Sequence, residues 1–90
     1  MRDSNFDKAA LPTPPAYFAS IGNPLRGRGP WRNAICPFHD DTRPSLRVNV
    51  ERGGWRCMAC GARGGDVLAL HMKRTGMDFK QALHDLGAWQ

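Results

Sequence analysis

Two short stretches decide the fold: residues 36–39 read Cys-Pro-Phe-His, and residues 57–60 read Cys-Met-Ala-Cys. Each stretch holds two metal-ligating residues with two residues between them, and seventeen residues separate the two stretches. A two-residue gap lets both side chains of one turn reach the same ion, which is the spacing found in tetrahedral zinc sites. The sequence therefore predicts one zinc ion, with these ligands: Cys36, His39, Cys57 and Cys60.

Other uses of these residues fit the sequence less well. Four protein ligands leave no open coordination position, so we expect the zinc to be structural. A redox pair at Cys57 and Cys60 would need a βαβ setting that the surrounding pattern lacks. An iron–sulfur cluster usually takes four cysteines, and this chain has three. One alternative stays open, in which His71 or His84 replaces His39, although neither stands in such a pair.

The segment between the two ligand pairs is predicted to form a β-hairpin. Its first strand alternates strictly, with Leu46, Val48 and Val50 on one face. Strands are predicted at residues 31–35, 45–50 and 55–57, and the turn Glu-Arg-Gly-Gly at residues 51–54. The sheet itself would thus bring the two ligand pairs together.

The C-terminal part of the sequence changes to helical periodicity. Asp66 is a good N-cap for a helix that Gly76 can end. Asp78 and Gln81 have the spacing of a capping box at the start of a second helix, which Gly87 closes. The predicted fold is a small α+β structure: a zinc ribbon with a short antiparallel β-sheet and one structural zinc, followed by two short helices.

The length of 90 residues allows one domain. Residues 1–15 contain Leu-Pro-Thr-Pro-Pro and are predicted to be a flexible Pro-rich tail, and residues 16–90 are predicted to be the zinc-ribbon domain, opening with a helical turn at 16–21. No apolar stretch approaches the ~20 residues of a membrane span, and the N-terminus lacks the apolar core of a secretory signal. We therefore expect a cytoplasmic protein without a membrane partner.

Charge favours a polyanionic partner. The formal net charge is +5 and the isoelectric point is near 9.7. Arg47 and Arg56 are expected on the face of the sheet that points away from the core, and a basic sheet with a nearby aromatic ring is typical of single-strand binders. The candidate nucleic-acid contacts are Arg43, Arg47, Arg52, Arg56, Arg63 and Trp55. Each of three aromatic residues, Trp55, Trp31 and Phe38, either stacks on bases or is a packing residue, and the loop at residues 26–29 either touches phosphates or is solvated.

The residues around the ligands resemble a known family. Cys-Pro-Phe-His-Asp-Asp at 36–41 and Arg-Pro-Ser-Leu at 43–46 are similar to the zinc-binding domain of bacterial DnaG-type DNA primases. The similarity continues through Trp-Arg-Cys-Met-Ala-Cys-Gly at 55–61 and Gly-Gly-Asp-Val at 64–67, and covers roughly residues 16–87. The resemblance implies a zinc ribbon that binds single-stranded template DNA. It also implies a separate polymerase domain of Toprim fold, in which acidic residues hold Mg²⁺.

The sequence departs from the primases in that polymerase domain. The chain ends at Gln90, and the adjacent Asp40 and Asp41 are no substitute for a Mg²⁺-binding cluster, so we expect no primer synthesis by this chain alone. The expected function is to bind template and to support a separate polymerase domain. The alternative is an interaction module that docks on a helicase or polymerase without touching DNA, and salt-dependent binding to oligonucleotides distinguishes the two.

Overall fold

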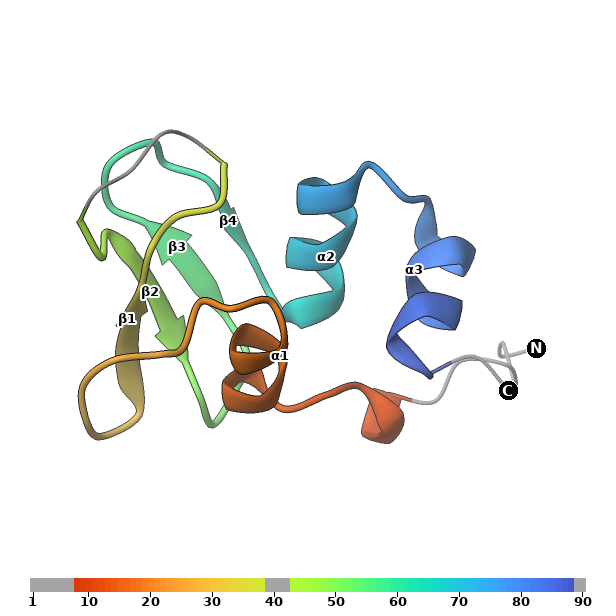
Figure 1. The fold of residues 1–90 in the computed structure, drawn as a ribbon, viewed down its shortest axis with the longest axis horizontal. Coiled ribbons are helices and arrows are strands. Elements are labelled where there is room, and N and C mark those ends of the chain that lie inside the picture. Colours follow the sequence, from red (N-terminus) through yellow and green to blue (C-terminus); the bar gives the residue numbers. More distant parts are fainter. Residues whose placement is uncertain (1–7, 39–42, 89–90) are drawn as a thin grey trace.

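A four-stranded antiparallel sheet and three α-helices make up the computed structural model, which describes residues 8–38 and 43–88 (Figure 1). The strands are β1 (Trp31–Ala34), β2 (Leu46–Asn49), β3 (Trp55–Cys57) and β4 (Arg63–Gly64). The helices are η1 (Lys8–Ala10, a 3-10 turn), α1 (Pro14–Ser20), α2 (Val67–Thr75) and α3 (Phe79–Leu86). The strand order β1-β2-β3-β4 follows the chain, and the predicted α+β class is confirmed.

The hairpin between β2 and β3 forms where the sequence predicts it. The Asn49 side chain accepts hydrogen bonds from the backbone N–H groups of Glu51 and Arg52, at 2.9 and 2.8 Å. Gly53 has φ +89°, a conformation that glycine adopts without strain. Turn geometry thus sets the register that places Leu46 opposite Cys57.

Three elements differ from the sequence-based expectation. The 3-10 turn η1 lies within residues 1–15, which were predicted to be a flexible tail. Helix α1 begins at Pro14, because Thr13 caps it by accepting from Ala16 N–H at 3.3 Å and because proline in the first turn lacks only an N–H that would be unpaired there. The strand β4 was not predicted, since two residues are too short to show a periodicity.

Each face of the sheet has its own character. Leu46 and Val48 are fully buried, as the alternation predicts, and they pack in one core cluster with Phe18 of α1 and Leu70 of α2. A second, smaller cluster between α2 and α3 contains Leu68, Ala82, Leu83 and Ala88. The helices therefore cover one face of the sheet, and among the described residues no helix or strand covers the other, on which Arg47, Arg56 and Arg63 are exposed.

The caps of the two C-terminal helices are confirmed. Asp66 accepts from Ala69 N–H at 2.8 Å, and Gly76 ends α2 in the left-handed conformation. Asp78 and Gln81 form the reciprocal capping box of α3. Within the two described ranges, none of the helices has the length and apolar character needed to cross a membrane.

The outer edge of β1 is paired by residues that precede it. The backbone of Arg26 exchanges two hydrogen bonds with that of Asn33, at 2.7 and 2.9 Å. The side chain of Asn23 donates to the carbonyl of Ile35 at 2.7 Å and accepts from its N–H at 3.1 Å. The Asn23 amide therefore takes the place that a neighbouring strand would take.

Candidate zinc site and nucleic-acid surface

Three cysteines meet at one end of the sheet. Cys36 follows β1, Cys57 ends β3, and Cys60 lies in the turn after β3. Their sulfur atoms all lie within 4.8 Å of one another, and Cys36 Sγ is 3.8 Å from Cys60 Sγ. Zinc–thiolate bonds of about 2.3 Å in a tetrahedron place the sulfurs about 3.8 Å apart. The cluster therefore has the donors and the spacing of a zinc site.

The turn after β3 directs backbone N–H groups at a sulfur. Ala59 and Cys60 donate to Cys57 Sγ at 3.4 and 3.3 Å, and Gly61, at φ +81°, donates to the carbonyl of Cys57 at 3.0 Å. The N–H groups of Ala59 and Cys60 stabilise negative charge on the Cys57 sulfur, which is the form that binds metal. The arrangement explains why two residues separate the cysteines of this turn.

Cys36 is poorly suited to being a thiolate without a metal. Burial is the main cause that raises the pKa of its thiol to about 12, and the neighbouring Cys57 and Cys60 add to the effect. The thiol therefore holds its proton at neutral pH in the metal-free chain, and this proton would have to leave before the sulfur could hold zinc. When bound, the ion supplies the positive charge that this buried sulfur requires.

His39 lies outside the described residues, so its role as the fourth ligand stays a prediction. The alternative ligand His71 is 4% exposed and occupied on both sides. Its Nδ1 is 2.9 Å from the hydroxyl of Tyr17, and its Nε2 is 2.6 Å from Asp85 Oδ2. His84 belongs to α3, at the opposite end of the molecule from the sheet (Figure 1). Among the described residues neither histidine belongs to the cysteine cluster, so His39 stays the predicted fourth ligand.

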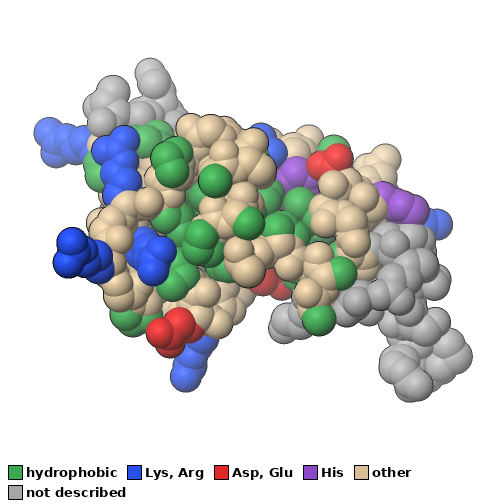
Figure 2. All heavy atoms as spheres, turned by 60° about the horizontal axis from the view of Figure 1, so that its bottom comes forward, with side chains coloured by type: hydrophobic (Ala, Val, Ile, Leu, Met, Phe, Trp, Pro, Cys, Tyr) green, Lys and Arg blue, Asp and Glu red, His purple; other side chains and the backbone are tan. Residues whose placement is uncertain are grey.

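A row of arginines crosses the open face of the sheet. Arg47 is paired with Arg56, and Arg56 with Arg63. Directly paired residues of antiparallel strands point to the same face, and all three side chains are exposed. Figure 2 shows basic side chains gathered at the end of the molecule that holds the sheet. The two arginines predicted on one open surface, Arg47 and Arg56, are therefore neighbours.

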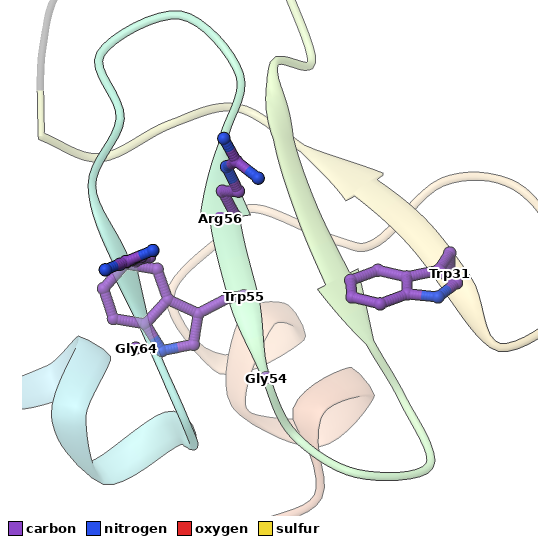
Figure 3. Close-up of a pocket in the computed structure, with 6 residues that line it drawn as sticks. Trp31, Gly54, Trp55, Arg56 and Gly64 are labelled. Atoms are coloured by element: carbon purple, nitrogen blue, oxygen red, sulfur yellow. The ribbon is translucent and has the colours of Figure 1, made fainter.

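Two tryptophans near this row differ in exposure. Trp55 is 3% exposed, donates from Nε1 to the carbonyl of Asp66 at 2.7 Å, and lies against Gly64 (Figure 3). Trp31 is 46% exposed, and the Arg47 guanidinium stands 5.9 Å from the centre of its ring. The burial of Trp55 conflicts with its predicted role as a DNA contact. Trp31, another of the three rings considered from the sequence, is the one that this surface offers.

Two hollows flank the arginines on this face. One has a volume of about 460 Å³ and is lined by Trp31, Gly54, Trp55, Arg56, Arg63 and Gly64. The other, of about 240 Å³, is lined by Trp31, Arg47, Arg56 and Met58. Trp31 and Arg56 border both hollows, as Figure 3 shows for the larger one. The face thus joins positive charge, an exposed ring and open space.

The remaining predicted contacts lie away from the row. Arg43 precedes β2 and Arg52 lies in the hairpin turn, so the two exposed side chains belong to opposite ends of β2.

The pairing of Arg26 with Asn33 was not predicted, because a single bridge inside a Gly- and Pro-rich loop leaves no periodic signal in the sequence.

Comparison with known proteins identifies the family of this fold. The family model described as CHC2 zinc finger matches residues 23–89, which include the sheet, the clustered cysteines, α2 and α3. A DNA primase of Pseudomonas putida is 37% identical over 62 residues, which are 69% of this chain and 9% of the primase. A DNA primase of Chlamydia trachomatis is 39% identical over 59 residues, which are 66% of this chain and 10% of the primase.

A phage protein is also similar. The gene 58 protein of Mycobacterium phage D29 is 38% identical over 53 residues, which are 59% of this chain and 40% of the phage protein. The aligned segment is thus less than half of each of these three relatives. Fold, cysteine cluster and family match agree, and the chain belongs to the CHC2 zinc-finger family, the zinc ribbons of DnaG-type DNA primases.

Proposed function

We propose that this zinc ribbon binds single-stranded DNA on the open face of its sheet. The observation that carries the proposal is the row Arg47–Arg56–Arg63 beside the exposed ring of Trp31. Arginine donates two parallel hydrogen bonds to a phosphate, and an exposed aromatic ring stacks on any base. None of the residues in the four strands is acidic, so nothing in the strands repels the DNA backbone.

Binding would serve primer synthesis by a separate polymerase domain. The relatives named DNA primase support this role. The aligned ribbon is 9–10% of their length, so in those proteins most of the chain lies outside the ribbon. A ribbon that holds template next to an active site raises the local concentration of that template and sets its register. The metal site would contribute to this function indirectly, since Cys57 ends β3 and the site thereby fixes the position of Arg56.

Replacing Arg47 and Arg56 together by Ala is expected to reduce affinity for an oligothymidylate without unfolding the ribbon, because both side chains are exposed. Each lost phosphate contact should lower the slope of log affinity against log salt concentration by about 0.7, so the double variant should lower it by about 1.4. Fluorescence anisotropy over a salt titration measures both quantities. The matched control is Arg28→Ala with Lys80→Ala, which removes the same charge from exposed positions outside the sheet.

The control should bind almost as the unaltered protein does. Equal weakening in the two double variants would mean that net charge alone attracts DNA, and would contradict a specific surface. No binding by the unaltered, zinc-loaded protein would overturn the proposal and favour the module that docks on a helicase or polymerase.

Adding the ribbon to its cognate polymerase domain, prepared separately, is expected to raise primer yield or to change the choice of start sites. The Arg47→Ala/Arg56→Ala variant should give a smaller effect, because template capture is weakened. Sequencing of the primers made on a natural single-stranded template provides the measurement. Identical yield and start sites with and without the ribbon would contradict a role in priming, even if DNA binding is observed.

A further inference from the structure

The arginine row is longer than the strands alone suggest. Arg26 is paired with Asn33, and Asn33 is paired in turn with Arg47. With the pairs Arg47–Arg56 and Arg56–Arg63, the five residues form one continuous line across the sheet. Because paired residues share a face, all five side chains project toward the open side. This line includes Arg26, which belongs to none of the four strands.

The line has a definite direction and length. It runs at right angles to the β-strands, and its four intervals of about 4.8 Å give a span of roughly 19 Å. Within the strands, the open face has no comparable series along the chain direction: on β2 the residue two places from Arg47 is Asn49, and β3 contributes Arg56 only. The exposed Arg43 and Arg52 lie beyond the two ends of β2. Among residues paired in the sheet, cations therefore follow one another across the strands.

A second line lies beside the first on the same face. Trp31 is paired with Asn49, whose N–H donates to the carbonyl of Gly54 at 2.8 Å. Gly54 has no side chain, and the larger hollow opens there between Trp31 and Arg56. One line thus offers cations, and the neighbouring line offers a ring and open space of about 460 Å³.

We propose that a single DNA strand crosses the sheet at right angles to the β-strands, with its phosphates along the line from Arg26 to Arg63. Its bases then lie toward Trp31 and the adjacent hollow. The inference rests on the proposed DNA binding, and adds a path and a new contact, Arg26. The backbone bridge to Asn33 brings this arginine to the sheet.

Replacing Arg26 by Ala tests the contact, and Arg28→Ala is the matched control from the same exposed loop. The backbone bridge uses no side-chain atoms of Arg26, so the fold should survive. We expect Arg26→Ala to weaken binding of an oligothymidylate of about 8 nucleotides by roughly threefold to tenfold, with a salt slope lower by about 0.7. Arg28→Ala should leave affinity and slope nearly unchanged.

Spin-labelled DNA tests the path without altering the protein. The zinc-loaded, ¹⁵N-labelled chain is mixed with the same oligonucleotide carrying a nitroxide at its 5′ or its 3′ end. One label should broaden amide signals near residues 26–29, and the other should broaden those near residues 61–64. A strand lying along the β-strands would instead broaden the hairpin turn at 51–54 and the cysteine turn at 58–60.

The possible outcomes distinguish the crossing path from the proposed DNA binding on which it rests. Salt-dependent binding with equal effects of the Arg26 and Arg28 changes, or with broadening at 51–54 and 58–60, overturns the crossing path and leaves DNA binding in place. Absence of binding by the unaltered protein overturns both. A selective decrease in affinity for Arg26→Ala, with broadening at the two ends of the line, supports the path.

Discussion

Cys57→Ser is expected to unfold the zinc ribbon. Metal binding in such sites contributes on the order of 10 kcal/mol of apparent folding free energy, which is as large as the whole stability of a small domain. Cys57 Sγ is buried and accepts from two backbone N–H groups, so a serine there removes a ligand and the centre of the turn. Circular dichroism and zinc content per chain provide the measurement, and the unaltered protein should hold one zinc.

Ala59→Ser is the matched control for this change. Ala59 lies in the same turn, is exposed, and offers no metal ligand, so its variant should keep the zinc and the fold. Exhaustive chelation of the unaltered protein should reproduce the loss of structure seen with Cys57→Ser. A native-like spectrum that persists after complete chelation would contradict a structural role for the metal.

Gly64→Ala is expected to destabilise the protein by about 3 kcal/mol, through crowding and a weakened hydrogen bond. A methyl group on Gly64 would lie only 2.6 Å from Cε2 of Trp55, whose ring is buried and held by its bond to Asp66. The ring has to move, and the core between β3 and α2 has to move with it. Thermal unfolding measures the effect, which should lower Tm by roughly 15 °C.

The neighbouring glycine supplies the comparison. A Cβ on Gly65 meets nothing within 4 Å, so Gly65→Ala should leave Tm almost unchanged. Equal shifts in the two variants would mean that the backbone of this segment, and not the ring of Trp55, sets the requirement for glycine.

Local signals explain what the sequence predicted correctly. The hairpin and the caps at Asp66 and Asp78 depend on residues close together in the chain. The cysteine cluster depends on the two-residue spacing of Cys57 and Cys60 and on the predicted sheet, which brings Cys36 to them. Strict alternation around Arg47 also assigned the two faces of β2 correctly, because burial of Leu46 and Val48 leaves no other orientation.

Tertiary contacts account for what the sequence did not predict. Trp55 is buried because it packs in the core cluster with residues of α2, whereas Trp31 is exposed. The contact of Trp55 with Gly64 joins strands β3 and β4. The bridge between Arg26 and Asn33 likewise joins an irregular loop to a strand edge. Neither contact has a periodic pattern by which to be recognised.

The paired outer edge of β1 has a consequence for how the protein behaves when concentrated. An exposed strand edge is a template on which a second chain can add its own strand, and this is a common route to aggregation. Here the Asn23 amide and the Arg26 backbone already occupy the N–H and carbonyl groups of Ile35 and Asn33. At the other edge, β4 is only two residues long. Among the described residues, the edges of the sheet therefore offer few backbone groups on which a second chain could pair, whereas the face with the arginine row stays exposed.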